Sequence, residues 1–148
     1  MSSLRVFVSF DLEHDRDLFD LLLAQAAKPS AGFEIAGRSE ARERPGSWDD
    51  ELRLRIREAD EVIFLCGEHT GDSMAMQSEL SIVREERRPY FLLWGRREIM
   101  CTKPIGAKPA EGMYSWTGQN LHDQIALTLR KARADAAAET VRDAARRP

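Results

Sequence analysis

Short apolar segments alternate with amphipathic ones along most of this 148-residue chain. The apolar segments are rich in Val, Ile, Leu and Phe, which is typical of short strands buried on both faces of a sheet. We predict strands at residues 5–10, 33–36, 61–67, 89–94 and 113–116. Because strands that alternate with helices favour a parallel sheet covered on both faces, the pattern predicts an α/β protein.

The segments between the predicted strands carry apolar residues every three or four positions, which is the spacing of amphipathic helices. We predict these helices at residues 15–27, 47–59 and 73–87, and from about residue 119 onward. Beyond Lys131 the sequence is rich in Ala, Arg, Asp and Glu, and Val141 is its one large apolar residue. We therefore expect a domain of residues 1–130 and a helical tail of residues 131–148, which is a frayed end or a weak association surface.

Composition excludes several classes of protein. The net charge of −3 and the pI of about 5.7 argue against a general nucleic-acid binder, which needs a basic face. No apolar stretch is long enough to cross a membrane, and the run at residues 6–8 is too short for a signal peptide. Cys66 and Cys101 form no CxxC pair, so we expect reduced thiols in a cytoplasmic protein.

The common nucleotide and hydrolase motifs are missing. Residues 9–14, which follow the first predicted strand, contain no glycine, and the sequence has no GxGxxG, no GxxxxGK[ST] and no GxSxG. The third predicted strand ends in Cys66-Gly67-Glu68, whereas a response regulator needs an aspartate there. His14 and His69 lie in predicted loops near acidic residues, but no HxxxH spacing supports a metal site, so we predict none.

Ligands of parallel sheets bind at the carboxyl ends of the strands. Three predicted loops lie at that edge, at residues 11–15, 37–46 and 67–73. A fourth irregular stretch, residues 95–112, is long for a compact domain, and loops of that length are often functional or mobile.

Glu79 occupies a position where the predicted helix of residues 73–87 should carry an apolar residue. With about 3.6 residues per turn, it shares a face with Met76, Ile82 and Val83. Burying an unpaired carboxylate is costly, so such a residue has either a partner or a task. The pattern leaves two interpretations open: a structural glutamate that reaches solvent or pairs with an arginine, and a functional carboxylate.

Several segments together resemble the TIR-like family that includes the TIR subunit of the Thoeris antiphage system. They are Arg5-Val-Phe-Val-Ser-Phe-Asp11, Asp15-Arg-Asp-Leu18, Ile63-Phe-Leu-Cys-Gly-Glu-His-Thr70, Ser78-Glu-Leu80 and Met113-Tyr-Ser-Trp-Thr-Gly-Gln-Asn-Leu121. The resemblance covers roughly residues 4–130. It implies a flavodoxin-like, three-layer α/β sandwich around a central, mainly parallel, five-stranded sheet.

The resemblance also implies an activity. Active family members cleave the nicotinamide–ribose bond of NAD, which is a substrate and not a cofactor, and often cyclise the ADP-ribose product. That product is a nucleotide signal that activates a separate effector protein, and self-association or a trigger often completes the site. The implied function is an NAD glycohydrolase or ADP-ribosyl cyclase in bacterial antiphage defence.

The implied catalytic residue is Glu79, because the family places a glutamate on the helix after the third strand. Ser9 and Phe10 match positions that line the NAD pocket, and Asp11 and Arg38 are looser candidates for substrate binding. A guanidinium at residue 38 suits a pyrophosphate, although a solvated loop arginine is an equally good interpretation.

One departure from the family favours a different function. Many catalytic members carry an aromatic residue, usually Trp, four residues before the glutamate, and this chain has Ala75 there. Trp94 or Trp116 is a candidate for the missing aromatic wall. The alternative is a non-catalytic protein–protein interaction module, which docks a partner through the charged loop of residues 38–44.

Overall fold

The computed structural model describes residues 4–41 and 47–146. Five parallel strands form one sheet in the order β2-β1-β3-β4-β5, which is the flavodoxin-like order. The predicted fold class is therefore confirmed, and the sheet is parallel throughout. The strands are β1 (Leu4–Ser9), β2 (Phe33–Arg38), β3 (Glu61–Cys66), β4 (Tyr90–Trp94) and β5 (Met113–Ser115).

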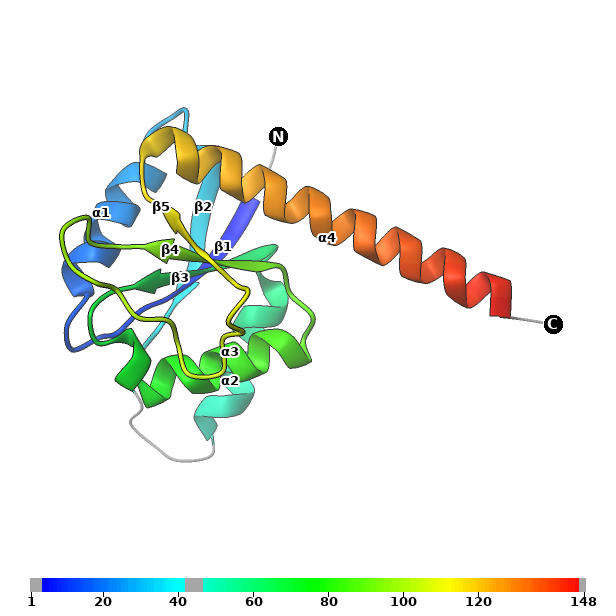
Figure 1. The fold of residues 1–148 in the computed structure, drawn as a ribbon, viewed down its shortest axis with the longest axis horizontal. Helices are drawn as coiled ribbons and strands as arrows, with labels where there is room; N and C mark the ends of the chain where they lie inside the picture. The colour runs from blue at the N-terminus through cyan, green and yellow to red at the C-terminus, as the bar shows by residue number, and fades with distance from the viewer. Residues whose placement is uncertain (1–3, 42–46, 147–148) are drawn as a thin grey trace.

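Helices cover both faces of this sheet, so the molecule has three layers (Figure 1). α1 (Arg16–Ala26) and the first turns of α4 (Gly118–Arg146) pack on one face, while α2 (Ser47–Glu58) and α3 (Met74–Glu85) pack on the other. A short 3-10 turn, η1 (Thr70–Asp72), precedes α3. The alternation along β3 shows how the core divides, because Ile63 and Leu65 join the α1 side and Val62 and Phe64 join the α2 side.

β2 is longer than the predicted strand of residues 33–36. It continues through Gly37 and Arg38 alongside β1, with a register shift between Val6 and Phe7. A Cβ atom on Gly37 would lie 2.9 Å from a ring carbon of Phe7, so the glycine lets the two strands pair over a buried aromatic ring. The extension carries the end of β2 to the carboxyl edge of the sheet.

The stretch at residues 95–112 is tied to the domain at several points. Cys101 is 3% exposed and packs in the α2–α3 core, and the Thr102 N–H donates to the Gly67 carbonyl at 2.9 Å. Arg84 of α3 reaches the same stretch and donates to the Gly106 carbonyl at 2.6 Å. Cys66 and Cys101 are both free thiols, and burial raises the pKa of Cys66.

α4 extends well beyond the domain (Figure 1). Its first turns bury Leu121, Gln124 and Ile125, whereas nearly every residue from 130 to 146 is exposed. Within the described residues no helix is both long and apolar enough to cross a membrane. The side chains of Ser47 and Trp48 lie outside the described part of the chain, as do residues 42–44 of the predicted docking loop.

Candidate active site

Three buried polar side chains meet at the carboxyl edge of the sheet. Ser9 is the last residue of β1, Ser39 directly follows β2, and Glu79 lies in the middle of α3. Ser9 Oγ donates to Glu79 Oε1 at 2.9 Å, and Ser39 Oγ donates to the same carboxylate, 2.8 Å from both of its oxygens. Each of the three residues is 2% exposed or less. We call them the Ser-Ser-Glu cluster.

Backbone pairing places the two serines. β1 and β2 run side by side, and the Ser39 N–H continues their ladder by donating to the Val8 carbonyl at 3.0 Å. The Ser39 hydroxyl also accepts the Phe10 N–H at 3.0 Å. Ser39 therefore joins the ends of two strands and the carboxylate of a helix on the far side of β1.

Helical spacing places Glu79. α3 begins after Ser73, whose side chain accepts the Met76 N–H at 3.2 Å and so caps the helix. Met76, Leu80 and Val83 are buried against the sheet, and Glu79 shares their face. At 2% exposure Glu79 does not reach solvent, and the serine hydroxyls compensate part of the cost of its burial.

Phe10 and Arg38 lie beside the cluster and turn toward α1. Phe10 is 1% exposed and stacks on Phe19, with the ring centroids 4.8 Å apart. The Arg38 guanidinium lies over the same Phe19 ring, 5.2 Å from its centroid. Arg38 is therefore neither a solvated loop residue nor directed at the carboxylate, but it ends the strand that leads to Ser39.

Asp11 belongs to a neighbouring hollow of about 410 Å³. Its Oδ1 accepts the N–H groups of Glu13 and His14, and its Oδ2 lies 3.3 Å from His14 Nδ1. The His14 ring stacks on His69 at 3.9 Å. Ala75, one turn before Glu79, also lines this hollow, so the hollow and the Ser-Ser-Glu cluster are adjacent through α3.

The two tryptophans that were candidates for the missing aromatic wall do not line this hollow. Trp94 and Trp116 line a different hollow together with Leu21 and Gln25 of α1. The Trp116 indole donates to Gln25 Oε1 at 2.8 Å, and the Trp94 indole donates to the Arg96 carbonyl. Neither ring lines the hollow beside Ala75, so neither of these two tryptophans replaces the missing aromatic residue there.

A buried ion pair braces the loops at this edge. Asp15 is 1% exposed, and Arg96 binds it at 3.1 Å and binds Asp17 at 2.8 Å. Burial raises the pKa of Asp15, and the hydrogen bond from Arg96 opposes that rise. A Cβ atom on Gly67 would clash with Asp15 Oδ2, so the carboxylate packs directly on the backbone that follows β3.

The family model for the TIR-like domain of the Thoeris protein ThsB matches residues 7–96, which is more than half of the chain. This chain belongs to the ThsB TIR-like family. The match includes all three members of the Ser-Ser-Glu cluster and ends before β5 and α4. The resemblance inferred from the sequence is thereby confirmed for residues 7–96, and the part quoted from residues 113–121 lies outside the match.

The solved structures that resemble this ThsB-family domain include an N-glycosidase. The structure of the CMP N-glycosidase BcmB from Clostridium botulinum has 14% sequence identity and a TM-score of 0.49, over 83% of this chain and 98% of that chain. A likeness of that degree says nothing about the substrate of this chain. A search of curated proteins found no match.

Ser39 is the member of the cluster that the sequence did not single out. It falls just beyond the predicted second strand, at the start of a charged loop. One feature of the sequence could have indicated Ser39: it follows Arg38 near the carboxyl end of the second predicted strand. Recognising it requires knowing that β2 continues to residue 38 and that Ser39 meets a helix 40 residues later in the chain.

Proposed function

We propose that this ThsB-family domain is an NAD-cleaving enzyme, an NAD glycohydrolase or ADP-ribosyl cyclase, with Glu79 as its catalytic residue. The observation that carries the proposal is a carboxylate fixed by Ser9 and Ser39 at the carboxyl edge of a parallel sheet. That edge is where such sheets bind ligands, and the resemblance of the sequence to the family implies the same residue. The product is an ADP-ribose-derived nucleotide signal for an effector in antiphage defence.

The chemistry requires a fixed negative charge. When the bond between C1′ of the ribose and the nicotinamide nitrogen breaks, its electron pair leaves with the nicotinamide. The ring thereby loses its positive charge, so the leaving group needs no proton. Positive charge develops at C1′, and the Glu79 carboxylate stabilises it. Attack by water gives ADP-ribose and a proton, while attack by a nitrogen of the adenine gives a cyclic product.

The neighbouring residues bind the rest of the substrate in this proposal. Ser9 and Phe10 line the pocket for the reacting ribose, and Asp11 lies in the adjoining hollow. Arg38 binds the pyrophosphate after leaving Phe19, because a guanidinium matches phosphate oxygens. Glu79 is 2% exposed in the single chain, so we propose that self-association or a trigger opens the site.

A second candidate function is a non-catalytic interaction module. Two observations favour it: Ala75 stands where many catalytic members carry an aromatic residue, and the Glu79 carboxylate is closed off by its serine partners. In that case the Ser-Ser-Glu cluster only joins α3 to the ends of β1 and β2. NAD would then neither bind nor be consumed.

The deciding experiment measures NAD loss and product mass in lysates of phage-infected cells that express the chain. Glu79→Gln keeps the size of the side chain and removes its charge, and Glu85→Gln makes the same change at an exposed position of α3. We expect a new ADP-ribose product with the wild type and with Glu85→Gln, and at least a hundredfold less with Glu79→Gln. Equal turnover by Glu79→Gln excludes Glu79 as the catalytic residue, and no product from the folded wild type favours the interaction module.

A further inference from the structure

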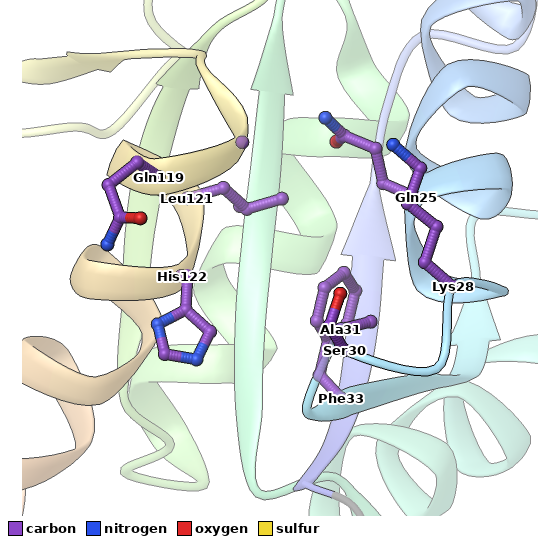
Figure 2. Close-up of a pocket in the computed structure, with 9 residues that line it drawn as sticks. Gln25, Lys28, Ser30, Ala31, Phe33, Gln119, Leu121 and His122 are labelled. Atoms are coloured by element: carbon purple, nitrogen blue, oxygen red, sulfur yellow. The ribbon is translucent and has the colours of Figure 1, made fainter.

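A second hollow lies at the opposite edge of the sheet from the Ser-Ser-Glu cluster. It has a volume of about 400 Å³ and lies between the end of α1 and the start of α4 (Figure 2). Phe33 lines it and begins β2, whereas Ser39 follows the end of the same strand. A strand of six residues spans about 20 Å, so the two sites are separate. We call this hollow the α1–α4 cavity, and its volume is in the range of small-molecule sites.

Three polar side chains at the α1–α4 cavity are hydrogen-bond donors, whereas Gln119 donates its amide NH₂ to Asp123 at 2.9 Å and keeps a carbonyl acceptor. The Trp116 indole donates to Gln25 Oε1, which leaves the Gln25 amide NH₂ as the group with a hydrogen to offer. Lys28 contributes an ammonium, which has no ion-pair partner among the described residues, and Ser30 contributes a hydroxyl. None of the nine described lining residues is acidic, and the nearby carboxylate of Asp123 is bound by Gln119 at 2.9 Å and lies 3.8 Å from His122 Nδ1.

The inner wall of the cavity is apolar. Phe33 is 5% exposed and Leu121 is 2% exposed, and both belong to the core beneath α1 and α4. His122 extends from α4 toward the loop before β2, and its Nε2 lies 3.9 Å from the position of a Cβ atom on Gly32. Figure 2 shows Leu121 and His122 on one side of the gap and Gln25 and Lys28 on the other. Phe33, Leu121 and His122 thus give the cavity an apolar and aromatic surface.

We propose that the α1–α4 cavity binds a small phosphomonoester that carries a planar ring. Three separate donors, at Gln25, Lys28 and Ser30, suit the three terminal oxygens of a phosphomonoester better than the two oxygens of a carboxylate. The ring lies against His122 and Leu121. This site is independent of NAD cleavage, because it uses other residues at the other edge of the sheet.

Adenosine 5′-monophosphate is the probe, and the indole N–H resonance of Trp116 is the reporter, because that group holds Gln25 beside the cavity. The full chain, labelled with ¹⁵N, is titrated with the probe, with adenosine and with inorganic phosphate. We expect the probe to shift the Trp116 and Gln25 resonances, and each of its two parts to bind at least tenfold more weakly.

Lys28→Glu reverses the charge in the cavity, and Lys131→Glu makes the same change on α4 outside it. We expect Lys28→Glu to weaken binding at least tenfold and Lys131→Glu to leave it unchanged. His122→Ala is a second exposed variant, and it should weaken binding of the probe but not that of phosphate. Equal affinity of the wild type and Lys28→Glu, shifts confined to residues around Ser9, or equal binding of phosphate and the probe would overturn the proposal.

Discussion

Two buried glutamates, Glu79 and Glu61, differ in the hydrogen-bond partners that surround their carboxyl groups. Glu79 accepts hydrogen bonds from two serine hydroxyls, an arrangement that suits a carboxylate. Glu61, at the start of β3, is 0% exposed, and neither of its carboxylate oxygens has a hydrogen-bond partner among the described residues. Burial, followed by the nearby charge of Asp60, raises the pKa of Glu61 to about 9. The surroundings therefore supply hydrogen-bond donors to the carboxylate of Glu79 and disfavour the charged form of Glu61.

Replacing Glu61 tests this difference through pH. Because the pKa of Glu61 is raised by folding, its contribution to stability is complete below about pH 4.5 and is lost as the pH rises toward 9. Glu61→Gln stays neutral throughout. We expect the free energy of unfolding of Glu61→Gln to rise relative to that of the wild type as the pH increases. Between pH 4.5 and 9 the difference should grow by up to about 1.4 kcal/mol per pH unit. Urea denaturation at pH 5, 7 and 8 measures it, and a constant difference between the two proteins would contradict the prediction.

Removing the Ser39 hydroxyl should weaken both the fold and the site. Ser39→Ala leaves the buried Phe10 N–H without its acceptor and Glu79 without a donor, so we expect a loss of about 1–3 kcal/mol in unfolding free energy. Combining it with Glu79→Gln should cost less than the sum of the single changes, because the two residues interact directly. A double-mutant cycle from urea unfolding gives the coupling, and strict additivity would show that the bond has no energetic weight.

At the scale of elements, periodicity predicted most of the sheet and little of the site. The cores of β1, β3 and β4 were correctly predicted, because each is a short run of apolar residues with polar or Gly and Pro neighbours. β2 was predicted too short, since its last residues are a glycine and an arginine that pairing with β1 makes extended. Leu21 and Leu23 belong to the apolar pattern of α1 yet are exposed. The spacing of apolar residues does not show how much of the helix surface the sheet covers.

The polar partners could not be predicted for a related reason. Helical spacing identified Glu79 as a residue on a buried face, which is a local property of α3. Its bonds to Ser9 and Ser39 span 70 and 40 residues, and they depend on strand order and on where β2 ends. The ion pair between Asp15 and Arg96 spans 81 residues and gives no periodic signal either.

That ion pair gives a prediction about how the loops are joined. Arg96→Ala leaves the Asp15 carboxylate buried without its cation. We therefore expect the free energy of unfolding to fall by an amount that approaches the roughly 3–5 kcal/mol of a broken buried ion pair. Burial then raises the pKa of Asp15 without opposition, and the loss should shrink as the pH falls and the carboxyl takes up a proton. Urea unfolding at pH 7 and pH 4 measures it, with the neighbouring, exposed Arg97→Ala as the control. A loss equal at both pH values would show that the charge of Asp15 is not involved.

For the whole molecule, the projecting part of α4 should be dispensable for folding. Its residues beyond 130 are almost all exposed, and a surface ion pair joins Glu139 to Arg87 of the domain at 3.5 Å. A chain ending at residue 130 should therefore lose less than about 1 kcal/mol of unfolding free energy. Calorimetry of the full and shortened chains checks this, and a larger loss would place residues 131–148 within the cooperative unit and against the proposed domain boundary.

The position of β1 between β2 and β3 has a consequence for synthesis on the ribosome. β1 is the first strand to emerge, yet its neighbour β3 begins only at residue 61. Ser9 cannot bind Glu79 until 70 more residues have been synthesised. At about 5–20 residues per second, several seconds pass before the nascent strand can be enclosed. During that interval its apolar side chains depend on chaperones or on early pairing with β2, and the Ser-Ser-Glu cluster cannot form before α3 has emerged.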